Sequence, residues 1–151
     1  MLSGSSSIDQ AYRTMATVWF ILLLSQFMFF GVAMLVAGEA ILAASQQPAE
    51  PENTLMVFLF ATLALTNLGL SFVFRKRAQE QAVTEQKIKH VQTGLIIACA
   101  FCESISILGV VLAVAFHYQY FYLWIIVGII GIFLHFPRRK HLLDASSART
   151  L

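Results

Sequence analysis

The sequence predicts an all-α integral membrane protein, a bundle of four transmembrane helices. Of its 151 residues, 58% are hydrophobic and 12% are charged, and the apolar residues gather in four long runs. A helix needs about 20 apolar residues to cross a bilayer core of about 30 Å. Strands of a membrane barrel are shorter and alternate apolar with polar residues. Because these runs are continuous, we expect helices rather than a barrel, in a single domain.

The four predicted spans cover residues 15–37, 55–74, 91–116 and 120–136. A serine-rich segment precedes the first span, and we expect it to be a mobile polar tail. The first apolar run is longer than a typical signal core, which favours a retained helix over a cleaved secretory signal. The segment between the first two spans contains Pro48 and Pro51 and should be irregular.

Residues 75–90 separate the second and third spans and are rich in good helix formers, without Gly or Pro. We therefore expect a helical loop, in which the second and third helices extend beyond the membrane. Two roles stay open for this loop. It could be a solvated helical hairpin, or it could dock a cytoplasmic partner.

The positive residues predict the orientation of the bundle. All ten Lys and Arg residues lie before the first span, between the second and third spans, or after the fourth. Short loops rich in Lys and Arg stay on the cytoplasmic side, so both termini and residues 75–90 should be cytoplasmic (N-in/C-in). We expect a multi-pass protein of the bacterial inner membrane. Its basic residues also meet anionic headgroups, and we expect no binding of nucleic acid.

One carboxylate lies deep inside an apolar span. Glu103 follows His90 by thirteen residues, which places it roughly 20 Å along the third helix, near the middle of the bilayer. A charge there costs about 3 kcal/mol on insertion scales, so the side chain should face the bundle interior or a partner. Glu103 is therefore the candidate proton-binding residue. In the alternative, it is permanently protonated and only joins helices by hydrogen bonding to Gln26 or Asn67.

Polar and small residues at similar depth complete the candidate site. We expect four polar side chains to support the carboxyl group, namely Gln26, Thr66, Asn67 and Ser106. Glycines let membrane helices approach closely. Four of them are candidates for helix packing, namely Gly31, Gly109, Gly128 and Gly131.

Residues 100–113 read AFCESISILGVVLA, with Ala three positions before Glu103, Ile four after it, Gly six after it and Ala ten after it. In this spacing the segment resembles the proton-carrying helix of the rotary ATPase c subunit, or proteolipid. The resemblance implies a proton carrier at Glu103 within a larger membrane complex. It is limited to this segment. The repeated Gly-x-Gly pattern of the family's partner helix is absent, and four-helix proteolipids carry the Glu in the fourth helix rather than the third.

Cys99 and Cys102 form a C-x-x-C pair and are the only cysteines. The pair is similar to those of membrane disulfide-forming enzymes such as vitamin K epoxide reductase, so a membrane thiol oxidoreductase is an alternative function. Such enzymes need a second cysteine pair, and thiolates are favoured at helix N-termini rather than in mid-helix. No phosphate loop, zinc-protease motif or nucleophile and base set is visible. We expect a non-enzymatic subunit without a metal or cofactor, acting with other membrane subunits or by self-association.

Overall fold

The computed structural model describes residues 3–44 and 51–147, which form five α-helices and no strand. The helices are α1 (Ser3–Ala44), α2 (Pro51–Glu85), α3 (Ile88–Phe116), α4 (Tyr122–Leu134) and α5 (Arg139–Ser147). Three of them, α1, α2 and α3, are long and apolar enough to cross a membrane. The shorter α4 passes the same test only together with α5, from which it is bent by 43°. The predicted all-helical class is confirmed. By length and composition, three helices could cross a membrane, or four if α4 and α5 count as one span.

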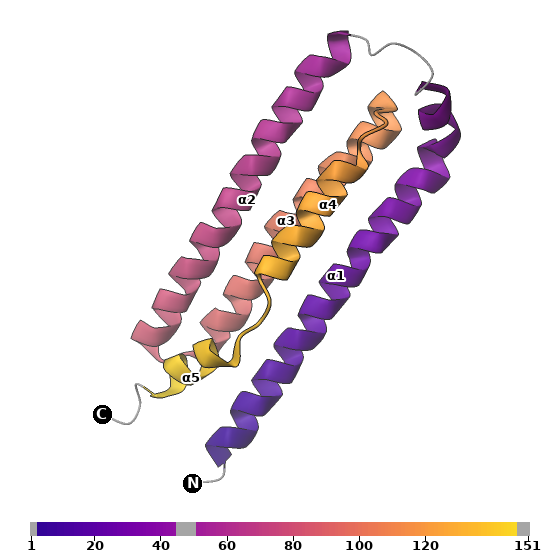
Figure 1. Ribbon diagram of the computed structural model, residues 1–151. Coiled ribbons are helices and arrows are strands. Elements are labelled where there is room, and N and C mark those ends of the chain that lie inside the picture. The colour runs from indigo at the N-terminus through magenta and orange to yellow at the C-terminus, as the bar shows by residue number, and fades with distance from the viewer. Residues whose placement is uncertain (1–2, 45–50, 148–151) are drawn as a thin grey trace.

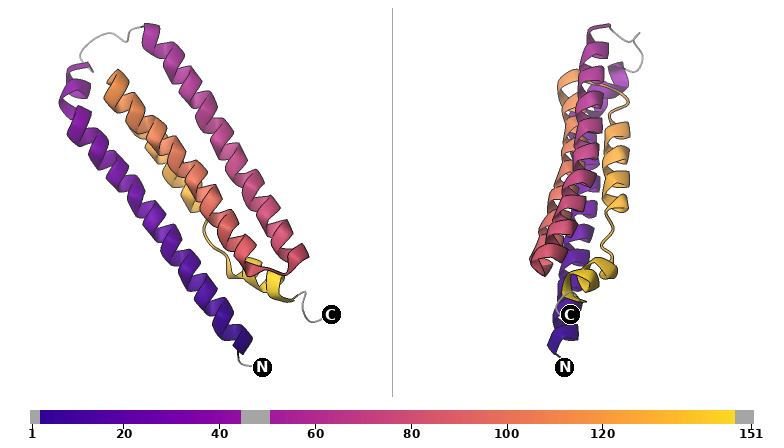
Figure 2. Two further views of the ribbon diagram at one scale, coloured as in Figure 1. Left: turned by 180° about the vertical axis from the view of Figure 1, so that it is seen from behind. Right: turned by 90° about the vertical axis from the view of Figure 1, so that its left-hand side faces the viewer.

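The central element is α3, which contacts α1, α2 and α4. Figure 1 shows α1 and α2 on opposite sides of the molecule, with α3 and α4 between them. The edge-on view of Figure 2 places α3 and α4 on opposite faces of the layer. The cross-section is therefore a flattened rhombus, in which α3 and α4 meet across the short diagonal.

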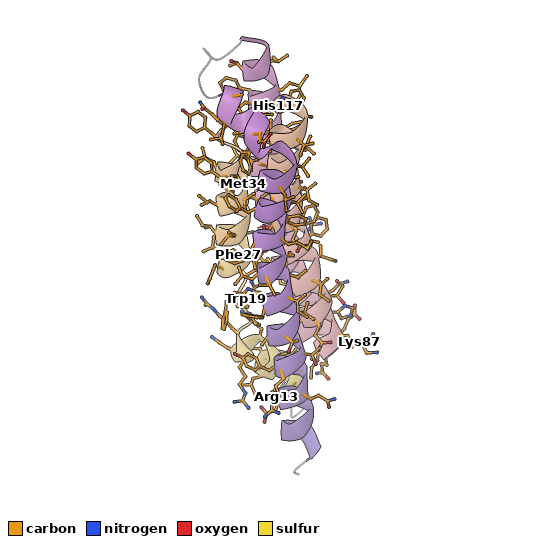
Figure 3. All side chains as sticks on the ribbon, turned by 90° about the vertical axis from the view of Figure 1, so that its right-hand side faces the viewer. Arg13, Trp19, Phe27, Met34, Lys87 and His117 are labelled. Carbon is orange, nitrogen blue, oxygen red and sulfur yellow. The ribbon has the colours of Figure 1, made fainter. Side chains whose placement is uncertain are left out.

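Both termini, the α2–α3 turn and α5 lie at one end of the bundle, and the α3–α4 turn lies at the other (Figure 1). Figure 3 shows Arg13 and Lys87 toward the first of these ends and His117 at the second. The segments that hold the Lys and Arg residues of the described part of the chain thus share one end, which we call the basic end. This is the distribution that the orientation argument requires.

Some predicted boundaries are wrong. Helix α1 begins at Ser3, so the serine-rich segment is helical from that residue on, and its mobility stays a prediction. Residues 75–90 are helical as expected, apart from a turn at Gln86 and Lys87, where Gln86 has a φ of 53°. The last span ends at Leu134 instead of residue 136, because the ring of Pro137 disfavours helical backbone at the preceding residue. Helix α5 was not predicted.

Two buried clusters hold the bundle together. One lies toward the basic end and includes Met15, Trp19 and Leu142, and the other includes Ile105, Leu112 and Phe121. Many large apolar side chains on α1 and α2 are exposed instead, with Leu35 at 88%. These side chains suit the apolar interior of a bilayer, whereas their exposure to water would be unfavourable.

Candidate functional site

Glu103 contacts α1 through a serine. The hydroxyl of Ser25 lies at hydrogen-bond distance from the Glu103 carboxyl group, and its Oγ is also 2.7 Å from the carbonyl oxygen of Leu22. A hydroxyl group has one proton to donate. When Glu103 is ionised, Ser25 can donate that proton to the carboxylate. When Glu103 is protonated, it can donate to Ser25, whose own proton then goes to Leu22. Both protonation states of Glu103 therefore have a satisfied hydrogen-bond arrangement.

Glu103 lies on the outer face of α3, not in the bundle interior. The face turned away from α4 is lined at helical spacing by exposed apolar residues, which we call the α3 stripe: Ile96, Ala100, Ile107, Val111 and Val114. Glu103 is half-buried in the middle of this stripe. The carboxyl group is bonded to α1, and the rest of the side chain is accessible to lipid or to a neighbouring helix.

A second polar pair is fully buried between α1 and α3. The Ser106 hydroxyl donates to Oε1 of Gln26, and the Gln26 amide nitrogen has no partner. The pair fits because Gly128 on α4 has no side chain. A Cβ there would overlap Ser106 Oγ and would lie 3.0 Å from the carbonyl oxygen of Cys102. Gln26 and Ser106 thus bond to each other, and neither is the partner of Glu103.

The α2 side of α3 has its own polar contact. Asn67 donates to Ser104 at 2.9 Å, and Ser104 donates to the backbone of its own helix. The predicted partners of Glu103, Gln26 and Asn67, are therefore wrong, and Ser25 takes that place. Thr66 is also not a supporting residue, because it is exposed and donates to the Thr62 carbonyl. Ser25 stood at the right depth in the sequence, but depth alone does not tell which side of α1 faces α3.

The four candidate packing glycines differ in their surroundings. A Cβ at Gly109 would lie 2.8 Å from Trp124 Cβ, and one at Gly131 would lie 2.6 Å from Cys102 Sγ. Gly128 is equally crowded, so three of the glycines lie at the α3–α4 contact. Gly31 has nothing within 4 Å and is exposed, so its expected packing role within this chain is wrong. Sequence reasoning missed Gly94, where a Cβ would overlap Ala78 of α2.

Cys99 and Cys102 are both buried and free. Cys102 fills the space left by Gly131, so its place is in the α3–α4 packing. Within residues 8–43 and 54–146, no group of three or more His, Cys, Asp or Glu side chains could hold a metal ion.

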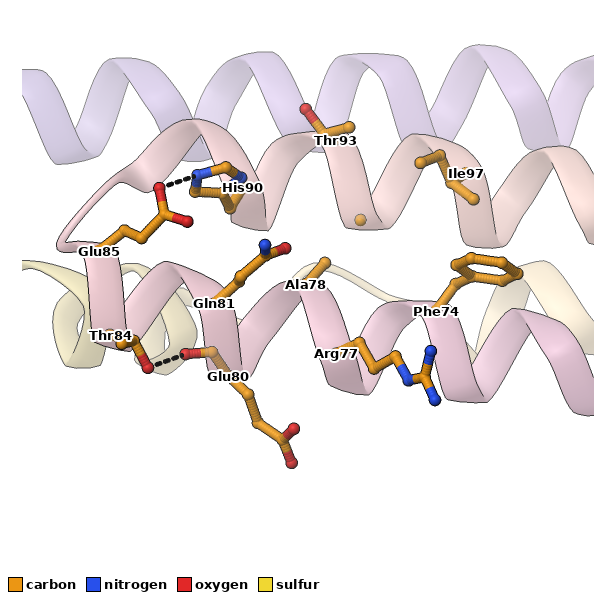
Figure 4. A pocket seen from close by; sticks show the side chains of 11 residues that line it. Phe74, Arg77, Ala78, Glu80, Gln81, Thr84, Glu85, His90, Thr93 and Ile97 are labelled. Carbon is orange, nitrogen blue, oxygen red and sulfur yellow. Dashed lines mark hydrogen bonds and ion pairs between the residues drawn. The ribbon is translucent and has the colours of Figure 1, made fainter.

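At the basic end, α2 and α3 enclose a groove of about 630 Å³, lined by residues between Phe74 and Ile97 (Figure 4). Glu85 accepts hydrogen bonds from Lys87 and His90, each at 3.0 Å. The bond from Lys87, followed by that from His90, lowers the pKa of Glu85. A docking role for this loop stays a prediction.

Two side chains tie α4 to its neighbours near the same end. Trp19 on α1 donates from Nε1 to the Ile132 carbonyl at 2.8 Å, and the buried His135 contacts Ser71 of α2 at 2.9 Å. These contacts hold the end of α4 in place between α1 and α2.

No protein-family model matches the chain, and neither does any curated protein or solved structure. The function is therefore inferred from the site itself.

Proposed function

We propose that this chain is a small, non-enzymatic subunit of a larger membrane complex, in which Glu103 binds and releases a proton. The observation that carries the proposal is the pair of hydrogen-bond arrangements at Ser25. Leu22, Ser25 and Glu103 form a short chain of polar groups that can serve both the acid and the carboxylate. A residue that only joined two helices would need one of these arrangements.

The position of Glu103 in the α3 stripe supports the same function. A carboxylate that faced lipid in mid-membrane would be costly. Glu103 must then be protonated there, or be covered by another membrane subunit or a second copy of this chain. Alternation between these two environments is a way to couple proton binding to a helix contact. The similarity of residues 100–113 to the c subunit of rotary ATPases favours proton carriage as well. With the basic end cytoplasmic, the proposed location is the bacterial inner membrane.

The test is infrared spectroscopy of the purified full chain across a pH series. A protonated carboxyl group in an apolar site gives a carbonyl stretching band that water-exposed carboxyl groups do not. We expect this band to disappear as the pH rises, to be missing in Glu103→Gln, and to shift in Ser25→Ala. Glu39→Gln is the matched control, because it removes an exposed carboxylate of α1 and should leave the band unchanged.

The second candidate is a structural or assembly subunit, favoured by the direct link that Glu103 makes between α1 and α3. It predicts a carboxyl band that does not change with pH, because the group stays protonated, and it predicts that Glu103→Gln keeps assembly intact. A constant band together with full assembly of the Gln variant would refute proton exchange.

A further inference from the structure

A small pocket lies at the basic end, between α2 and the connection from α4 to α5. Its volume is about 230 Å³. The lining is mainly basic and apolar. It includes Phe72, Arg75, Lys76, Leu134, Arg138 and His141. No Asp or Glu lines it. The pocket therefore gathers positive charge from two separate parts of the chain.

The fold holds the two arginines at this pocket. Arg75 donates from Nη2 to the carbonyl oxygen of Phe136 at 3.0 Å, which fixes its guanidinium group against the connection. Pro137 and Leu142 are fully buried and anchor both sides of Arg138. The next residue, Arg139, pairs instead with Asp9 of α1. Of these two successive arginines, Arg139 pairs with α1 and Arg138 lines the pocket.

Three salt bridges near this end of the bundle join residues outside the pocket. They are Arg139 with Asp9, and both Lys87 and His90 with Glu85. Lys76 of the pocket pairs with Glu80, and that pair is exposed and 3.9 Å long.

The positive charges of the pocket also act on His141, which lies beyond the apolar span. Burial lowers its pKa, and the charges of Arg75 and Arg138 act in the same direction, while Asp144 opposes them. The pocket is therefore rich in positive charge.

We propose that this pocket binds the phosphate group of an anionic phospholipid of the surrounding membrane. Arginine guanidinium groups bind phosphate oxygens with two parallel hydrogen bonds. Phe72 and Leu134 are 43% and 60% exposed at the edge of the pocket, on the apolar side, where acyl chains would run. Basic pockets between membrane helices on the cytoplasmic side bind lipid headgroups of this kind. Free phosphate would use the arginines but would leave both apolar side chains uncovered.

The test is native mass spectrometry of the full chain in mild detergent, titrated with dioleoylphosphatidylglycerol, dioleoylphosphatidylcholine or inorganic phosphate. The pocket variant is Arg75→Gln with Arg138→Gln. The control variant, Arg77→Gln with Lys89→Gln, removes the same charge from residues outside the pocket. We expect the wild type and the control to prefer phosphatidylglycerol, and the pocket variant to bind it roughly a hundredfold more weakly, because it loses the charge-assisted hydrogen bonds of two guanidinium groups.

Arg138→Gln alone keeps the experiment decisive if the double variant does not fold, because Arg138 is exposed. It should weaken phosphatidylglycerol binding by about tenfold, because it loses the charge-assisted hydrogen bonds of one guanidinium group. Equal losses in the pocket and control variants would overturn the proposal, since binding would then follow net charge alone. Equal binding of the two lipids would also overturn it. Saturation by inorganic phosphate that leaves no lipid preference would refute the lipid as the ligand. The result does not depend on Glu103.

Discussion

Gly109→Ala and Gly31→Ala are the same chemical change in two apolar helices, and the structure predicts different effects on stability. At Gly109, the new methyl group would lie 2.8 Å from Trp124 Cβ and 2.9 Å from the carbonyl oxygen of Phe121. Neither atom can rotate away, because Trp124 Cβ is bonded directly to the backbone of α4 and the oxygen of Phe121 is a backbone atom of the residue just before α4. At Gly31, nothing lies within 4 Å.

The magnitude follows from these distances. Carbon atoms in ordinary contact are about 3.5 to 4.0 Å apart, so α3 and α4 must separate by roughly half an ångström or more at Gly109. Overpacking of this kind costs about 1 to 3 kcal/mol. Alanine has a helix propensity up to about 1 kcal/mol better than glycine, which offsets part of that cost. We expect Gly109→Ala to lower the free energy of unfolding by about 1 to 2 kcal/mol, and Gly31→Ala to leave it unchanged or slightly raised.

The assay is reversible unfolding of both variants in mixed micelles of mild detergent and increasing sodium dodecyl sulfate, followed by circular dichroism. Wild type, Gly31→Ala and Gly109→Ala are compared under the same conditions. A neutral Gly109→Ala would show that α3 and α4 are not in close contact there. An equal loss in Gly31→Ala would show that α1 packs where the structure leaves it open.

Two further outcomes are expected. Trp19→Phe keeps most of the ring packing but loses the hydrogen bond to the Ile132 carbonyl, so the unfolding midpoint in the same micelles should fall by the equivalent of about 1 kcal/mol; an unchanged midpoint would contradict this. Because the hydrogen bonds from Lys87 and His90 lower the pKa of Glu85, this contact is present at neutral pH and is lost as the pH falls through that lowered pKa. A carboxyl-carbon NMR titration should give Glu85 a midpoint below the usual glutamate range, and Lys87→Ala should raise it.

Continuous apolar runs made the membrane-spanning helices predictable, because the length of a span is set by the bilayer. The helical loop at 75–90 was predictable for a local reason as well, since its residues favour helix and include no breaker. Helix α5 escaped prediction because its stability comes from tertiary contacts. It is short, and its buried Leu142 and Ala145 pack against a cluster of distant residues.

Within the candidate site, depth could be predicted but rotation could not. The rise per residue placed Glu103, Gln26 and Asn67 at the same level of the membrane. It did not tell which neighbour each side chain faces, because that depends on how the helices are arranged around α3. Ser25 and Gln26 are adjacent in sequence, yet they bond to different residues of α3. The glycines follow the same rule, since only those facing a neighbouring helix pack.

The central position of α3 has a consequence for biogenesis. Because α1 and α2 lie on opposite sides of α3, a nascent chain that has released only its first two helices has no extensive contact between them. We therefore expect these two helices to remain apart until α3 has been synthesised and packs between them. Ser25 acquires its carboxyl partner at that same step, so insertion of the costly Glu103 coincides with the first contact between α1 and α3. We therefore expect quality-control proteases to degrade ribosome-bound chains that end before α3 more readily than chains that include it.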